Sequence, residues 1–117
     1  RFHTDSVVSR SLIRRFFSAG YRFVLKLILG IKIADAPCGF KAINQKVKDS
    51  ILKQIQDDKW FFDSELIILA ENSNFKIKEI PISWKDPRTG DDKSKVQALS
   101  LSVAYFKQVL SMRKRLK

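Results

Sequence analysis

The sequence predicts an α/β domain built from amphipathic helices and a few short strands. Residues 7–29 carry a polar side chain at every fourth position among apolar ones, which is typical of a helix. Residues 75–84 alternate apolar and polar side chains, which is typical of strands. Hydrophobic residues make up 44% of the 117 residues, enough for the core of one domain.

The chain is strongly basic. Its formal net charge is +11, with seven Arg or Lys against one Asp in residues 1–33 and five Arg or Lys with no acid in residues 107–117. This charge predicts either an anionic partner or a solvated basic surface. Nucleic acid, an anionic membrane surface and phosphorylated substrates all fit.

Cysteine and histidine are rare. A single Cys forms no internal disulfide and suits a reducing, cytosolic setting. One His and one Cys do not make a zinc cluster. Because the chain opens on Arg1 rather than Met, we expect a piece of a longer protein that does not begin with a signal peptide.

The first predicted helix is capped at Asp5 or Ser6 and ends at Gly30. Its polar stripe consists of Arg10, Arg14, Ser18, Arg22 and Lys26. Arg22 and Lys26 interrupt the roughly 20 apolar residues that a membrane span needs. Two interpretations stay open: a core helix with one basic face, or a helix that packs partly on protein and partly at a membrane interface.

The middle of the chain is predicted to alternate strands and helices around a turn. Short strands are expected at residues 31–33 and 39–44, and a helix at 45–55. Asp63 is expected to cap the next helix, which ends at 72–74.

In residues 75–84, the alternation changes phase at Lys78-Glu79, which predicts a bulge or two successive strands. Pro81 favours an edge position for this segment, because proline has no backbone N–H to donate.

The C-terminal part is predicted to hold a polar loop at residues 85–95 and a basic amphipathic helix at 96–117. The expected apolar face of this helix consists of Leu99, Val103, Phe106, Val109 and Leu110. We therefore divide the chain into residues 1–95 and residues 96–117.

One stretch concentrates residues suited to chemistry, Asp-Ala-Pro-Cys-Gly-Phe-Lys at 35–41. Proline fixes its own φ and glycine permits a close backbone approach, so the turn can direct Asp35 and Lys41 at one spot. Asp35 is either a general base or a residue that caps the turn.

The polar stripe of the first helix is a candidate phosphate site. Arginine binds phosphate in a bidentate manner, so Arg10, Arg14 and Ser18 can clasp a phosphate beside an apolar surface, as a lipid phosphate requires. The alternative is a solvated basic face.

Two further groups of residues are candidates for a functional site. Asp63 and Glu65 follow three aromatic residues and either shape a polar pocket or interact with the dipole of a helix N-terminus. Ser94 and Lys95 end the polar loop, where the lysine either closes over a diphosphate or is only solvated.

Four motifs occur in a fixed order: Asp-x-x-Cys-Gly-Phe-Lys at 35–41, Trp-x-Phe-Asp-x-Glu-Leu at 60–66, Glu-Ile-Pro-Ile-x-Trp at 79–84 and Ser-Lys-Val at 94–96. Together they resemble the C-terminal half of family 2 glycosyltransferases that act on polyprenyl phosphates such as dolichyl phosphate. The resemblance runs from Arg1 to about Lys95.

This resemblance implies a GT-A (Rossmann-like) fold. It also implies transfer of a hexose from UDP-glucose or GDP-mannose to the lipid phosphate with inversion, using Mg²⁺ or Mn²⁺. Such an enzyme is expected to lie peripherally at the cytosolic face of a membrane.

The resemblance and the patterns together give three groups of site residues. The expected catalytic residues are Asp35, Asp63 and Glu65. The expected ligands of the acceptor phosphate are Arg1, Arg10, Arg14 and Ser18. The expected contacts to substrate and diphosphate are Lys41, Trp84, Ser94 and Lys95.

The sequence also departs from the family. The nucleotide pocket and the Asp-x-Asp metal motif of the N-terminal half do not occur in it, so we expect this chain alone to bind no metal and to lack transferase activity without that half. Ala36-Pro37 replaces the Thr-Gln that often follows the Asp, so the sugar preference does not carry over.

A rival interpretation is a basic nucleic-acid-binding module. It explains the charge. It does not explain the apolar character of the first helix or the Asp63/Glu65 pair.

Overall fold

The computed structural model describes residues 7–9, 12–85 and 94–117, and the side chains of residues 16–83, 100 and 102–117. Its elements are β1 (Val7–Ser9), α1 (Leu12–Leu29), α2 (Gln45–Ile51), the short 3-10 helix η1 (Leu52–Gln54), α3 (Phe62–Asn72), β2 (Ser83–Lys85) and α4 (Ser94–Arg115). In these residues the chain is mainly helical, with one pair of short strands.

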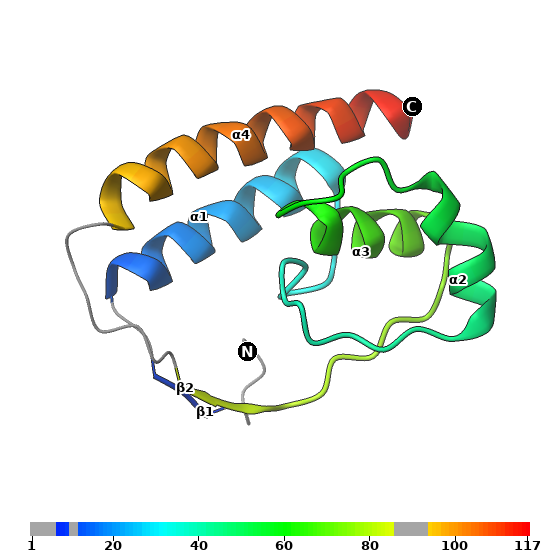
Figure 1. Cartoon of the computed structure of the whole chain (residues 1–117), viewed down its shortest axis with the longest axis horizontal. Helices are drawn as coiled ribbons and strands as arrows, with labels where there is room; N and C mark the ends of the chain where they lie inside the picture. The colour runs from blue at the N-terminus through cyan, green and yellow to red at the C-terminus, as the bar shows by residue number, and fades with distance from the viewer. Residues whose placement is uncertain (1–6, 10–11, 86–93) are drawn as a thin grey trace.

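Two long helices form one side of the molecule. α1 and α4 lie side by side, and α3 and α2 lie below their C-terminal ends (Figure 1). The hydrophobic core fills the space where these helices meet. It consists of Leu25, Ile31, Ala36, Val47, Ile51, Phe61, Leu66, Ile68, Leu69, Val109 and Met112.

The strands β1 and β2 pair in parallel, with Val8 opposite Trp84. The helix expected from Val7 therefore begins only at Leu12, and that part of the prediction is wrong. The β-branched residues Val7 and Val8 favour an extended backbone, and pairing with a distant segment outweighs the helical pattern. The caps expected at Asp5 and Ser6 lie outside the described residues.

The end of α1 agrees with the prediction. The helix ends at Leu29, and Gly30 follows with φ of +69°, a conformation that glycine adopts without strain. The backbone N–H of Gly30 donates to the carbonyl of Lys26 at 3.0 Å. This turn directs the chain away from α1 toward residues 31–35.

The strands expected at residues 31–33, 39–44 and 75–82 are not found, and these residues belong to no helix or strand. In the described part of the chain no neighbouring strand pairs with them. The backbone N–H groups of residues 32–35 instead donate to the carboxylates of Glu71 and Glu79.

The helices of the middle region lie close to their predicted places. Asn44 caps α2 by accepting from the backbone N–H of Val47 at 2.9 Å, and a 3-10 turn follows at Leu52. α3 begins at Phe62, so Asp63 lies inside its first turn and does not cap it, contrary to expectation. Its end at Asn72 agrees with the prediction.

The last helix begins and ends two residues earlier than predicted, and it is buried on a different face. α4 begins at Ser94, and its buried residues Val109 and Met112 pack with the partly buried Tyr105 and Leu116. Of the expected apolar face, Val109 is buried, but Val103, Phe106 and Leu110 are 56%, 46% and 39% exposed. The side chain of Leu99 lies outside the described residues.

Candidate functional site

The turn that begins at Asp35 is tied to the core. The backbone N–H of Cys38 donates to the carbonyl of Asp35 at 3.1 Å, which closes a four-residue turn with Pro37 at its third position. Asp35 is only 7% exposed and Ala36 1%. The turn therefore holds Asp35 in a fixed, largely desolvated position.

Lys41 joins this turn to the first turn of α3. Its ammonium group donates to the carbonyl of Cys38 and lies 3.3 Å from the Oδ1 atom of Asp63. Gly39 lies under the same carboxylate, because a Cβ atom at this position would lie 3.4 Å from Asp63 Oδ2. The structure thus brings Asp35, Lys41 and Asp63 together.

Burial lowers the pKa of Lys41, because the half-buried ammonium group loses solvation. The Asp63 carboxylate opposes this shift through its charge and its hydrogen bond, and Cys38 and Asp35 add smaller contributions in the same direction. The Lys41 ammonium group is thus partly dehydrated and lies among acidic side chains. A partly dehydrated cation is suited to contact with a phosphate group.

A second pair of carboxylates holds the segment that leads into the turn. Glu71, at the end of α3, accepts from the backbone N–H groups of Lys32 at 2.7 Å and Ile33 at 3.4 Å. Glu79 accepts with its Oε1 atom from those of Ala34 at 3.1 Å and Asp35 at 3.3 Å. Side chains take the place of a strand partner for four consecutive residues.

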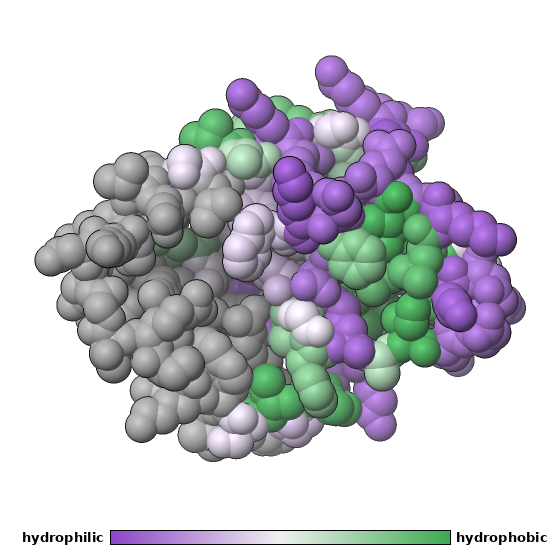
Figure 2. Space-filling model, viewed as in Figure 1, coloured by the Kyte–Doolittle hydropathy of each residue, from purple (hydrophilic) through white to green (hydrophobic). Residues whose placement is uncertain are grey.

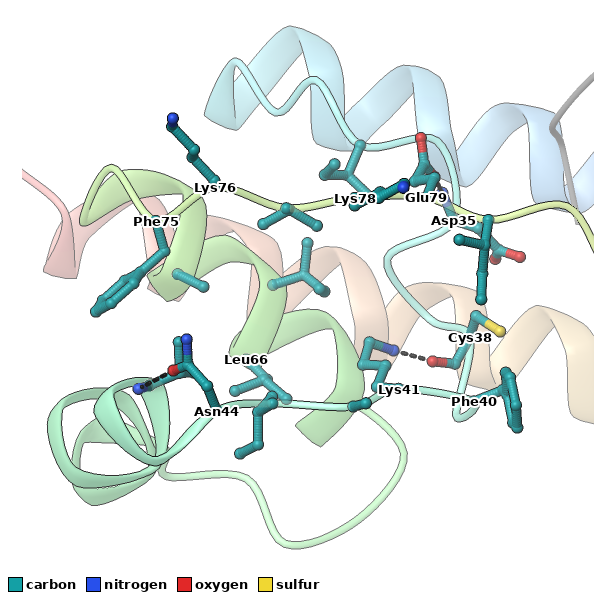
Figure 3. Close-up of a pocket in the computed structure, with 18 of the residues that line it drawn as sticks. Asp35, Cys38, Phe40, Lys41, Asn44, Leu66, Phe75, Lys76, Lys78 and Glu79 are labelled. Atoms are coloured by element: carbon teal, nitrogen blue, oxygen red, sulfur yellow. Dashed lines mark hydrogen bonds between the residues drawn. The ribbon is translucent and has the colours of Figure 1, made fainter.

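A cavity of about 680 Å³ opens beside the turn. Its walls are mostly apolar and come from residues 33–47, α3 and residues 75–82 (Figure 3). Asp35, Lys41 and Glu79 lie at one side of it, and Lys76 and Lys78 add positive charge. Its volume lies in the usual range for small-molecule sites, and a few polar groups converge on one end of it.

Glu65 is placed apart from this cavity. It is 1% exposed and accepts from the backbone N–H groups of Gln56 at 3.1 Å and Asp57 at 2.9 Å. Arg115 of α4 donates to its Oε1 atom at 2.5 Å. Its surroundings give Glu65 a role in holding the fold, and a catalytic role stays a prediction.

The candidate phosphate ligands are distributed along α1. Ser18 is half-buried and lies three residues before Tyr21, whose hydroxyl donates to Ser64 of α3 at 3.0 Å. Residues three apart share a helix face, so Ser18 lies on the side of α1 that faces the start of α3. Arg14 lies one turn earlier in α1, and its side chain lies outside the described part, as do all atoms of Arg1 and Arg10.

The other candidate ligands are placed by their backbone alone. Trp84 is the middle residue of β2, and Ser94 and Lys95 open α4 instead of ending a loop. Their side chains are not described, so their predicted contacts to a diphosphate stay predictions. Residues 86–93 of the loop predicted at 85–95 also lie outside the described residues.

Sequence reasoning missed the carboxylates of Glu71 and Glu79. Glu79 opens one of the four motifs, and its place there was the one signal that pointed to it. Glu71 stands in the polar end of a helix with nothing to mark it. The carbonyl of Cys38 was equally unforeseen, because a backbone acceptor has no signature in the sequence.

Two kinds of feature are not found in the described residues. No group of three or more His, Cys, Asp or Glu side chains there is arranged to hold a metal ion. Within the same residues, no helix combines the length and the apolar character needed to cross a membrane.

Comparison with curated proteins reveals relatives over most of the chain. Dolichyl-phosphate beta-glucosyltransferase of Saccharomyces cerevisiae is 39% identical over 85 residues, which is 72% of this chain and 25% of the relative. Glycosyltransferase AglD of Haloferax volcanii is 31% identical over 93 residues, or 80% of this chain and 15% of the relative. Dolichyl-phosphate beta-glucosyltransferase of Dictyostelium discoideum is 29% identical over 112 residues, or 96% and 33%.

The chain spans a third or less of the length of these relatives. No family model and no solved structure matches it. The curated relatives confirm the resemblance that the four motifs indicated.

Proposed function

We propose that this chain forms the acceptor side of an enzyme that glycosylates a polyprenyl phosphate. The premise is that the chain is a relative of the family 2 glycosyltransferases of the dolichyl-phosphate type. A hexose passes from UDP-glucose or GDP-mannose to the lipid phosphate with inversion at its anomeric carbon. The observation that carries the proposal is that Asp35 and Lys41 line one cavity and that Asp63 contacts Lys41, so that two of the motifs that resemble this family meet there.

The reaction needs little proton transfer. An ionised phosphate oxygen of the acceptor attacks the anomeric carbon, and the bond from that carbon to the nucleoside diphosphate breaks as the new C–O bond forms. Negative charge moves from the acceptor to the departing diphosphate. In this proposal, Lys41 supplies positive charge near that leaving group. Asp35 and Asp63 position Lys41 and stabilise its charged form, and they help to position the sugar.

The acceptor phosphate is proposed to bind along α1. Arg14 and Ser18 stand four residues apart, so they follow each other on one helix face, and Ser18 lies on the side of α1 that is tied to α3 by Tyr21. Arg1 and Arg10 precede them in the chain. Ser94, Lys95 and Trp84 are proposed to complete the contacts to the diphosphate.

The donor and the metal ion are assigned to the rest of the enzyme. The described residues do not fit a metal site, so no step of this proposal passes through one. Mg²⁺ or Mn²⁺ and the nucleotide would bind in an N-terminal half that together with this chain makes a GT-A fold. Residues 39–44, which border the cavity, would join the sheet of that fold.

A position at the cytosolic membrane surface is part of the proposal. α1 exposes Phe16, Phe23 and Leu27, and α4 exposes Val103, Phe106 and Leu110. Neither helix contains an acid. Exposed apolar side chains among cations suit an anionic lipid surface, where the acceptor is found.

The full-length enzyme with the substitution Arg14→Ala tests the acceptor site. We expect the KM for polyprenyl phosphate to rise about tenfold or more, because a charge-assisted contact to phosphate is worth about 1.5–3 kcal/mol. The KM for the nucleotide sugar should change less than about twofold, because that contact is absent from donor binding. Radiolabelled sugar transfer to detergent-solubilised polyprenyl phosphate measures both.

Arg15→Ala is the matched control, because it removes the same charge from the next residue of α1 and from a different face. It should leave both KM values near those of the wild type. Equal losses for donor and acceptor in Arg14→Ala, or transfer by the wild type only to soluble acceptors, would contradict the proposal.

The nucleic-acid-binding alternative is not favoured. The relatives named above are glycosyltransferases, and the cations of α1 and α4 share their helices with exposed Phe and Leu side chains.

A further inference from the structure

We propose that Glu79 is a positioning residue for Asp35, which it orients through the backbone. This inference rests on the proposed function, in which Asp35 helps to position Lys41 and the sugar. Glu79 opens the Glu-Ile-Pro-Ile-x-Trp motif, and Asp35 opens the Asp-x-x-Cys-Gly-Phe-Lys motif. The contact joins two motifs that lie 44 residues apart in the sequence.

The contact is specific to the residues that lead into the turn. A single oxygen of Glu79, Oε1, accepts from the backbone N–H of Ala34 at 3.1 Å and from that of Asp35 at 3.3 Å. Figure 3 shows Glu79 and Asp35 next to each other, on two different segments of the cavity wall. Hydrogen bonds to an ionised carboxylate are about twice as strong as neutral ones, so Glu79 is an effective anchor.

Asp35 is anchored on both sides of its Cα atom. Its N–H donates to Glu79, and its carbonyl accepts from the N–H of Cys38 at 3.1 Å. These two bonds restrict the φ and ψ angles of Asp35, and those angles set the direction of its Cα–Cβ bond. Asp35 is 7% exposed, so its side chain has little room to compensate for a shift of the backbone.

The backbone N–H groups of this segment are held by side chains. In the described part of the chain no strand pairs with residues 31–35, and Glu71 accepts from the N–H groups of Lys32 and Ile33, the two residues before Ala34. Without Glu79, the N–H groups of Ala34 and Asp35 would lose their partner while the turn after them stayed closed. The expected result is a displaced Asp35 in a folded protein.

The test compares Glu79→Ala, Glu79→Gln and Glu71→Ala in the full-length enzyme. Glu79→Ala should lower kcat by about tenfold to a hundredfold with both KM values within about threefold, since a displacement near 1 Å at a reacting group costs rate. Glu79→Gln keeps an Oε1 acceptor and should recover most of kcat. Glu71→Ala removes the neighbouring carboxylate and should keep kcat within about threefold.

Hydrogen–deuterium exchange gives a readout that needs no activity. Peptides that cover residues 31–38 should exchange faster in Glu79→Ala at Ala34 and Asp35, and in Glu71→Ala at Lys32 and Ile33. Raised exchange together with the selective loss of kcat in Glu79→Ala supports the inference. An unchanged kcat in Glu79→Ala, equal kcat losses in Glu79→Ala and Glu71→Ala, or no recovery in Glu79→Gln overturns it.

The same data separate this inference from the proposed function. A wild-type enzyme that transfers no sugar to polyprenyl phosphate contradicts the proposed function alone. The exchange comparison then still decides on Glu79: faster exchange at Ala34 and Asp35 supports it as the anchor of Asp35, and unchanged exchange overturns that role.

Discussion

Lys41 experiences two opposing influences within a few ångströms. Burial lowers its pKa, whereas the Asp63 carboxylate at 3.3 Å raises it. The net shift is downward, so between the pKa in the folded protein and the ordinary value near 10.5 the unfolded chain binds the proton more tightly. The contribution of Lys41 to stability therefore rises with pH across that window.

Asp63→Asn removes the favourable charge and leaves the burial. We expect the pKa of Lys41 to fall further, so that more of its amine is neutral at any pH below 10. Acylation of Lys41 at pH 8–9, followed peptide by peptide with mass spectrometry, should become faster.

Lys46 on the exposed side of α2 provides the comparison within the same sample, and its acylation rate should not change. A slower reaction of Lys41 in Asp63→Asn would mean that the carboxylate does not stabilise the ammonium form.

α4 is attached to the rest of the molecule by polar contacts near its C-terminus. Arg115 donates to the buried Glu65 at 2.5 Å and to the carbonyl of Gln54 at 2.7 Å, and Gln108 donates to Asp57 at 2.6 Å. Asp57 also accepts from the N–H groups of Lys59 and Phe61. The segment at residues 57–59 is thus an ordered junction that holds the end of the helix.

Arg115→Ala tests this attachment. The substitution leaves the carboxylate of Glu65 buried with its two backbone donors alone, and we expect the free energy of unfolding to fall by about 1.5–3 kcal/mol. Denaturant titration of the full-length protein measures the change.

Arg113→Ala is the matched variant, because Arg113 lies in the same helical turn and is exposed. It should change the free energy of unfolding by less than about 0.5 kcal/mol. Similar losses in both variants would show that general charge, and not the contact with Glu65, stabilises α4.

The molecule as a whole presents two acid-free helices side by side (Figure 1). Along the upper edge of Figure 2, where α4 lies, hydrophobic and hydrophilic side chains are mixed. Phe23 and Phe106 are 66% and 46% exposed, one on each helix. This composition fits a surface that inserts shallowly among lipid headgroups.

Phe23→Asp and Phe106→Asp should each weaken binding of the full-length protein to vesicles that contain anionic lipid. The expected change is about tenfold or more, because burial of a Phe side chain is worth about 1.5–3 kcal/mol. Co-sedimentation at two salt concentrations measures binding, and higher salt should weaken it in every variant.

Ile80→Asp is the control, because Ile80 is 56% exposed on the segment between α3 and β2. It should bind vesicles like the wild type. Equal losses in all three variants would place the membrane contact elsewhere.

Local sequence patterns were sufficient to predict most helices and several of their ends. Gly30 ends α1 and residues 72–74 end α3, as the sequence predicts, because a left-handed residue or a polar cluster stops a helix by local geometry alone. The grouping of Asp35 with Lys41 was also predictable, since both belong to one turn. The four motifs, read in order, indicated the resemblance that the curated relatives confirm.

Contacts between distant segments decided the rest. Val7–Ser9 form a strand only because Ser83–Lys85 lie beside them, and Glu79 reaches Ala34 and Asp35 across more than forty residues. The sequence predicted the wrong buried face for α4, because periodicity alone allows more than one apolar stripe. Contacts with α1, α3 and the junction at Asp57 select which side of the helix is covered. The sequence alone was therefore enough to identify the helices and the turn that holds Asp35. Only the fold shows which carboxylates hold that turn in place, because a hydrogen bond between remote residues depends on how the chain packs.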